Sequence, residues 1–118
     1  MKFRNVLTIT ALLILGSFGT YAFGSETLTD KPLLIDVRTL QEWNEGHLEG
    51  AILIPYETVG VEITKIAPYK QTEIRLYCRS GRRSGIALDA LKKLGYENVS
   101  NDGSVKSASE TLKIPVVK

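Results

Sequence analysis

A single cysteine followed by arginine and glycine is the feature of this sequence best suited to chemistry. Cys78 is the only cysteine among the 118 residues, and the residues after it are Arg79, Ser80, Gly81, Arg82 and Arg83. A glycine-containing turn that leads into a helix can aim several backbone N–H groups at one centre, and the helix dipole adds positive potential there. Such surroundings lower a thiol pKa from about 8.5 into roughly the 3.5–7.5 range. We therefore expect Cys78 to be largely ionised at neutral pH and to act as a nucleophile.

The alternative for Cys78 is an inert thiol in an arginine-rich turn. Single cysteines often behave simply as small apolar residues. Here, however, a strand, the cysteine, a glycine and a helix start follow one another in the order that an activated nucleophile requires. His47, the only histidine, suggests a Cys–His pair, but an ionised thiolate needs no general base, so we expect it to pack or hydrogen-bond at a helix end. One histidine and one cysteine do not make a structural zinc site, and no metal or organic cofactor is predicted.

The elements that must position Cys78 follow from the apolar pattern. Short apolar runs predict strands at residues 33–37, 51–54, 74–77 and 97–99. Helical periodicity predicts helices at residues 39–46, 59–66 and 82–94. Thr39 and Glu42 have the spacing of a capping box, and Gly95 suits a left-handed helix end. Residues 100–110, rich in Ser, Asn and Gly, are predicted to form a loop, and no state is predicted for residues 112–117.

Strands that alternate with helices indicate an α/β domain built on a mostly parallel sheet. In such sheets ligands bind beyond the carboxyl ends of the strands. Cys78 directly follows the predicted strand 74–77 and is therefore expected at one of these ends.

The first residues have the layout of a signal peptide. Lys2 and Arg4 precede an apolar stretch, and no acidic residue occurs before Glu26. Cleavage after Gly24 would leave one domain at residues 25–118 in the periplasm or otherwise outside the cytoplasm. The alternative is an uncleaved membrane anchor, because residues 6–23 approach the roughly 20 residues that a membrane helix needs.

The charge of the chain indicates no macromolecular partner. There are 15 Lys and Arg residues against 13 Asp and Glu residues, which gives a net charge of +2. Removal of residues 1–24 takes away Lys2 and Arg4 and no acidic residue, so the mature domain is close to neutral. Because no long run of one sign remains, no nucleic-acid partner is predicted, and a membrane is predicted only if the leader stays attached.

Two separated motifs resemble those of the rhodanese-like family. Residues 78–84 are similar to its active-site loop, and residues 35–38, 42–43 and 46–55 are similar to its upstream signature. The resemblance covers residues 33 to about 103, and the size and leader are similar to those of small periplasmic rhodaneses. It implies a sheet of about five strands with helices on both faces. Gly103-Ser104 departs from the paired glycines usual after the last strand, and residues 25–29 form a short lead-in, so the sheet edge and the C-terminal packing stay open.

The resemblance implies thiosulfate sulfurtransferase chemistry by double displacement. The Cys78 thiolate would take the outer sulfur of a small anionic donor such as thiosulfate and pass it to a thiol, to cyanide or to a protein acceptor. The backbone of residues 79–83 would bind the substrate, with Arg79 as the first candidate for the sulfonate and Arg83 as the second. Asp36 and Arg38 would support the loop, for which a salt link from Asp36 to a loop arginine is one means.

Two other functions compete with this interpretation. The first is a sulfur-relay or docking module that delivers its sulfur to a protein. The second is a phosphatase or arsenate reductase with a similar cysteine loop. Cysteine phosphatases as a family place their phosphate-clamping arginine one residue further from the cysteine than Arg83 lies, at the position that Ser84 occupies here. The shorter loop therefore favours sulfur over phosphate.

Overall fold

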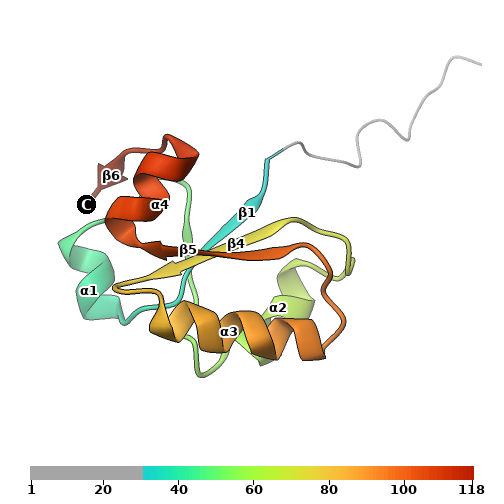
Figure 1. Cartoon of the computed structure of the whole chain (residues 1–118). Coiled ribbons are helices and arrows are strands. Elements are labelled where there is room, and N and C mark those ends of the chain that lie inside the picture. Colours follow the sequence, from blue (N-terminus) through green and yellow to red (C-terminus); the bar gives the residue numbers. More distant parts are fainter. Residues whose placement is uncertain (1–30) are drawn as a thin grey trace, which may run out of the picture. The chain divides into compact units, whose positions relative to one another are not determined.

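The computed structural model describes residues 31–118, which form a compact unit by themselves (Figure 1). The predicted signal peptide at 1–24 and the predicted start of the domain at 25 lie outside the described residues. Within residues 31–118, no helix is long and apolar enough to cross a membrane.

A parallel sheet forms the centre of the domain. Its strands lie in the order β3 (Ile52–Leu53), β1 (Leu33–Asp36), β4 (Ile74–Cys78), β5 (Val99–Ser104). All three neighbouring pairs are parallel, which confirms the predicted α/β class. In the described part of the chain this sheet has four strands, where the resemblance implied about five. Two further short strands, β2 (His47–Leu48) and β6 (Val116–Val117), form a separate antiparallel ladder.

Helices cover both faces of the sheet, as predicted (Figure 1). On one face lie α2 (Val59–Ile66) and α3 (Arg82–Lys93), and on the other lies α4 (Val105–Leu112). Successive strand residues point to opposite faces, so Leu76 packs in the first core, with residues such as Ile63 and Leu91, and Tyr77 in the second, with Leu48 and Ala108. This alternation gives the thin domain two apolar cores.

The predicted helix signals hold in the structure. In α1 (Leu40–Glu45), Thr39 and Glu42 form the capping box, and Gly46 closes the helix. The helix α3 begins at Arg82 and ends before Gly95, whose φ of 99° is left-handed. Ile66 and Leu94, the last residues of the predicted helices 59–66 and 82–94, are 44% and 42% exposed because they lie at the helix ends.

The loop predicted at residues 100–110 is wrong, and the short strand predicted at 97–99 begins only at Val99 and is longer than expected. The strand β5 runs from Val99 to Ser104, and α4 follows it at once. The polar residues of β5 do not have the apolar pattern of a strand. The segment forms an edge strand because it pairs in parallel with β4. In α4, Val105, Ala108 and Leu112 face the second core, but the serines between them weaken the apolar pattern.

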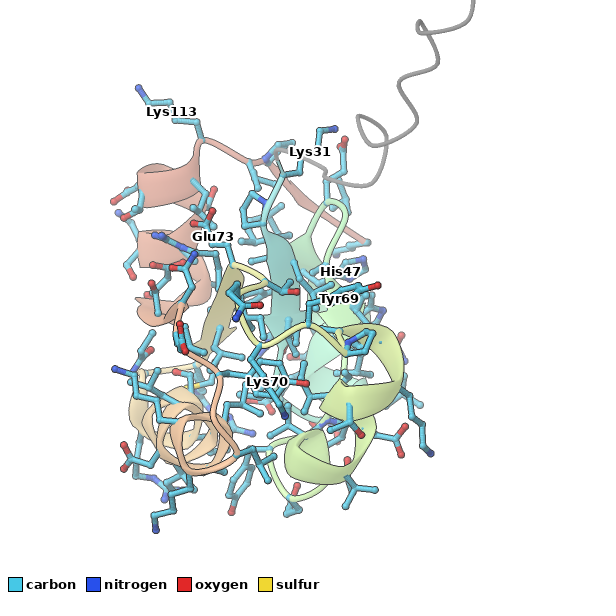
Figure 2. The ribbon with its side chains drawn as sticks, turned by 90° about the vertical axis from the view of Figure 1, so that its right-hand side faces the viewer. Lys31, His47, Tyr69, Lys70, Glu73 and Lys113 are labelled. Carbon is cyan, nitrogen blue, oxygen red and sulfur yellow. The ribbon has the colours of Figure 1, made fainter. Side chains whose placement is uncertain are left out.

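The serine that stands in place of a second glycine caps α4. Ser104 accepts a hydrogen bond from the backbone N–H of Ser107 at 3.0 Å, as an N-cap residue does. Gly103 must remain small, because its φ is 83° and an added Cβ would lie 2.8 Å from Ser107 Oγ. At the other end of α4, Lys113 has a left-handed φ of 58°, and its side chain extends away from the domain (Figure 2). The departure from the family pattern therefore leaves the C-terminal packing intact.

Candidate active site

Cys78 lies at the carboxyl end of β4, where the chain turns into α3. The turn is made by Gly81, which has a left-handed φ of 100° and directly precedes the helix. Its backbone N–H donates to Cys78 Sγ at 3.0 Å, and the Ser84 hydroxyl lies 3.4 Å from the same sulfur. The sequence thus predicted correctly that the loop folds its N–H groups toward the thiol.

Hydrogen bonds lower the pKa of Cys78. Burial alone would raise it, but the Ser84 hydroxyl and the backbone N–H groups of Ser84, Ser80 and Gly81 stabilise the thiolate and bring the pKa down to about 7. This pKa lies within the roughly 3.5–7.5 range expected from the sequence, so a substantial fraction of the molecules carries a thiolate at neutral pH. The thiol of Cys78 therefore ionises close to neutral pH.

The sulfur lies beneath the loop. Cys78 has no exposed surface and belongs to the same apolar cluster as Ile35 and Leu91. In this conformation solvent does not reach the sulfur. Ser80 is exposed and Gly81 is half-buried, so both are close to solvent where a sulfur donor would arrive.

The loop arginines divide into one paired and two exposed side chains. Arg83 donates from Nη1 and Nη2 to the two carboxylate oxygens of Glu42, each at 2.9 Å. The hydrogen bond from Arg83 is the main reason that the pKa of Glu42 falls to about 2. Arg79 and Arg82 are exposed, and neither has an ion pair among the described residues. These two are the cations available to an incoming anion.

Asp36 pairs with Arg38, and no contact joins it to an arginine of the cysteine loop. Arg38 donates to the Asp36 carboxylate from its backbone N, from Nε and from Nη2, the last at 2.7 Å. The same Nη2 donates to the carbonyl of Gly46 at 2.7 Å, and the guanidinium lies 5.8 Å from the centre of the Tyr77 ring. The pair therefore ties the end of β1 to the end of α1 and to β4.

His47 lies at the end of α1, where the sequence analysis expected it. Its Nδ1 is 3.0 Å from the Trp43 carbonyl, and its ring stacks on that of Trp43 with the centroids 3.5 Å apart. Among residues 31–118 no cluster of side chains has the composition of a metal site.

Comparison with known proteins places these features in a family. Residues 25–109 match the family described as Rhodanese-like domain. The chain belongs to the rhodanese-like family. It is 37% identical to thiosulfate sulfurtransferase PspE of Escherichia coli K12 over 84 residues, which are 71% of this chain and 77% of that protein. A solved structure described as a rhodanese with anions from E. coli superposes with a TM-score of 0.68 at 35% identity, over 75% of this chain and 99% of the other.

Other relatives of this rhodanese-like domain support sulfurtransferase activity in general. A protein of Allochromatium vinosum named sulfurtransferase is 34% identical over 73 residues, which are 62% of this chain and 66% of that protein. The named activity of these relatives agrees with a cysteine that ionises near neutral pH.

The contacts of two residues of this rhodanese-like site were missed by the sequence analysis. Ser84 had been placed in the segment that resembles the family's active-site loop and at the phosphatase arginine position, but its burial and its hydrogen bond to the sulfur were not predicted. Asn101, which accepts from Ser84 at 2.7 Å, lay in the segment predicted as a loop. Ser84 had a local signal, since it faces the cysteine one turn into the helix, but Asn101 had none.

The Glu42–Arg83 pair leads to a prediction about charge. Replacing Glu42 with Gln keeps a capping-box residue at its helix position but removes the anion that holds Arg83. We expect kcat/KM for an anionic sulfur donor to rise by roughly threefold, the size of a partly exposed ion pair. Glu45→Gln on the same helix, which removes an exposed carboxylate, should leave it unchanged. A fall in kcat/KM for Glu42→Gln would show instead that the pair is needed to shape the loop.

Proposed function

We propose that this protein is an exported thiosulfate sulfurtransferase that carries the transferred sulfur as a persulfide on Cys78. The observation that carries the proposal is the Cys78 thiol at the end of β4, to which the Gly81 N–H donates at 3.0 Å; such hydrogen bonds lower its pKa to about 7. Thiosulfate is the donor named for the relative from E. coli K12. Cyanide or a small thiol is the proposed acceptor.

The reaction proceeds in two displacements. The thiolate of Cys78 attacks the outer sulfur of thiosulfate, a bond from Sγ to that sulfur forms, and the bond to the inner sulfur breaks as sulfite leaves with the electron pair. The acceptor then attacks the outer sulfur of the persulfide, and Sγ departs as a thiolate. The N–H groups of Ser80, Gly81 and Ser84, which stabilise the resting thiolate, are placed to stabilise the anionic persulfide as well.

Intact-mass measurement tests this proposal. The purified protein should gain the mass of one sulfur atom when treated with thiosulfate, and a peptide that contains Cys78 should carry it. Added cyanide should remove the gain and release thiocyanate. If thiosulfate leaves the mass unchanged at every pH above the thiol pKa, the proposed donor is wrong.

Arg79 is proposed to hold the sulfonate end of the donor, since it is exposed and has no acidic partner among the described residues. Arg79→Ala should raise KM for thiosulfate by about tenfold, as expected for a lost hydrogen bond to a charged group. Persulfide formation from an uncharged donor should change much less. Lys93→Ala, the same loss of charge at the far end of α3, serves as the control. An equal loss with both donors would make Arg79 a stabiliser of the thiolate instead of a substrate clamp.

A sulfur relay is the second candidate function. One relative, from Bacillus subtilis, is named “Putative sulfur carrier protein YrkF” and is 33% identical over 81 residues, which span 68% of this chain and 43% of that protein. A relay would use the same Cys78 persulfide but deliver it to a protein. Transfer from the loaded protein to small thiols and to cyanide at a rate too slow for turnover would favour this candidate.

Phosphate chemistry is the rival that the loop geometry disfavours. Gly81 N lies only 3.0 Å from the sulfur, and Arg83 lies one position short of the phosphatase arginine and is bound to Glu42. We expect ready thiosulfate:cyanide sulfurtransferase activity and negligible hydrolysis of an aryl phosphate. A glycine inserted between Gly81 and Arg82 moves Arg83 to the phosphatase position and should lower sulfur transfer by roughly a hundredfold, because it displaces the N–H donors. Rapid aryl phosphate hydrolysis by the unaltered protein would contradict this prediction.

Export is proposed on the layout of residues 1–24. The test is to express the full chain in a bacterium and to determine the first residue of the protein recovered from the periplasm. A start at Ser25 is expected. Recovery of the uncleaved chain from membranes would support the anchor described above.

A further inference from the structure

Asn101 uses every polar atom of its side chain next to the cysteine loop. Its Oδ1 accepts from the Ser84 hydroxyl at 2.7 Å and from the Gly103 N–H at 2.9 Å, and its Nδ2 donates to the Gly81 carbonyl at 3.0 Å. A β-bulge places it there: Leu76 pairs with Asn101, but Cys78 pairs with Ser104, so β5 advances one residue more than β4. Bulges of this kind often re-aim side chains beside active sites.

The Ser84 hydroxyl has two acceptors for one proton. Asn101 Oδ1 lies 2.7 Å from Ser84 Oγ, and Cys78 Sγ lies 3.4 Å from it. A hydroxyl donates only one hydrogen bond at a time, and because Ser84 is fully buried, water does not supply another. When Cys78 is a thiol, its S–H can donate to Ser84 Oγ while the hydroxyl proton points to Asn101. When Cys78 is a thiolate, the hydroxyl proton must turn toward the sulfur to stabilise it.

We propose that Asn101 is a positioning residue for Cys78, which competes with the sulfur for the single hydroxyl proton of Ser84 and so restrains ionisation of the nucleophile. The thiol form keeps a complete chain of hydrogen bonds from Cys78 through Ser84 to Asn101. The thiolate form gives up the bond from Ser84 to Asn101, whose Oδ1 then keeps only the Gly103 N–H. The proposal rests on the proposed role of Cys78 as nucleophile.

The charged groups around this network are paired or exposed. On α3, Arg83 feels the charge of Cys78 and is bound to Glu42 of α1. On β5, Asp102 is bound to Arg75 of β4, with Nη2 and Oδ1 2.9 Å apart. On β1, Asp36 is bound to Arg38, and in the loop Arg79 and Arg82 are exposed. An uncharged replacement of Asn101 leaves all of these groups in place.

The test is the ionisation of Cys78, followed through the ultraviolet absorbance of the thiolate as pH is raised. Cys78 is the only cysteine, so the thiolate signal has a single source. Wild-type protein should titrate with a midpoint of about 7. Asn101→Leu removes the competing acceptor, so the midpoint should fall by about half a pH unit. Asn101 is exposed, so the variant is expected to fold, and Asn98→Leu, the same change at an exposed site before β5, should not shift the midpoint.

The same substitution in a Ser84→Ala variant distinguishes competition for the Ser84 proton from a general loosening of the loop. Ser84→Ala should raise the midpoint, because the thiolate loses its hydroxyl donor, and Asn101→Leu added to Ser84→Ala should shift it no further. The proposal is overturned if Asn101→Leu leaves the midpoint unchanged or raises it, or if it shifts the midpoint equally without Ser84. Since the readout is ionisation, it stands or fails independently of any measured sulfur transfer.

Discussion

Replacing Cys78 with serine should abolish sulfur transfer and leave the fold intact. A serine hydroxyl is not ionised at neutral pH and cannot hold a transferable sulfur, so turnover should fall to the rate without protein. The replacement is tolerated structurally because the Gly81 N–H and the Ser84 hydroxyl, which now contact Sγ, can bond to a serine oxygen. The buried site is therefore not left with an unpaired polar group.

Three measurements on Cys78→Ser check this prediction together. Thiocyanate formation from thiosulfate and cyanide should be absent, the mass should not increase with thiosulfate, and circular dichroism and thermal unfolding should resemble those of the wild type. Transfer near the wild-type rate would contradict the assignment of Cys78 as the sulfur carrier. An unfolded variant would be replaced by Cys78→Ala, for which the same absence of transfer is expected.

The parts of the site that could be predicted from the sequence are those made by neighbouring residues. Cys78, Gly81 and Ser84 are close together in the sequence. The end of a strand, a glycine and the start of a helix were therefore enough to predict that N–H donors surround the sulfur. The capping box of Thr39 and Glu42 was predictable for the same reason. Local chemistry of this kind does not depend on how the rest of the chain folds.

Contacts between distant segments were not predictable. Glu42 and Arg83 are 41 positions apart. The spacing of Glu42 from Thr39 already explained the carboxylate as part of the capping box, so no second partner was expected. In the structure one carboxylate serves both partners, because the first turn of α1 lies beside the first turn of α3. The second role depends on the packing of two elements that no short pattern relates.

The segment after residue 99 shows a different limit. The strand β5 carries Ser100, Asn101 and Asp102, which are typical of turns, and it becomes a strand because β4 offers a parallel edge. Its polar side chains are then used: Asp102 binds Arg75, and Asn101 binds Ser84 and Gly81. The residues that made the segment look like a loop are therefore those that connect it to β4 and to the cysteine loop.

Removing one member of the buried Asp36–Arg38 pair should have the largest effect on stability. Asp36 is fully buried and the Arg38 side chain is 8% exposed, so Asp36→Ala leaves a guanidinium without its partner inside the domain. Such a change costs about 3–5 kcal/mol, a large share of the roughly 5–15 kcal/mol by which small domains are stable. The Gly46 carbonyl remains as an acceptor for Arg38, but it carries no charge.

Urea unfolding of both single variants and of the double variant tests whether the pair acts as a unit. Asp36→Ala and Arg38→Ala should each lower the free energy of unfolding by about 3 kcal/mol or more, and Asp36→Leu with Arg38→Met should recover most of that loss, since apolar residues can replace a buried ion pair. Losses below about 1 kcal/mol in the single variants would contradict a supporting role for the pair. If the double variant is stable but its thiol titrates far from pH 7, the pair also shapes the loop that holds Cys78, through the contacts of Arg38 with the Gly46 carbonyl and with the ring of Tyr77, the residue before Cys78.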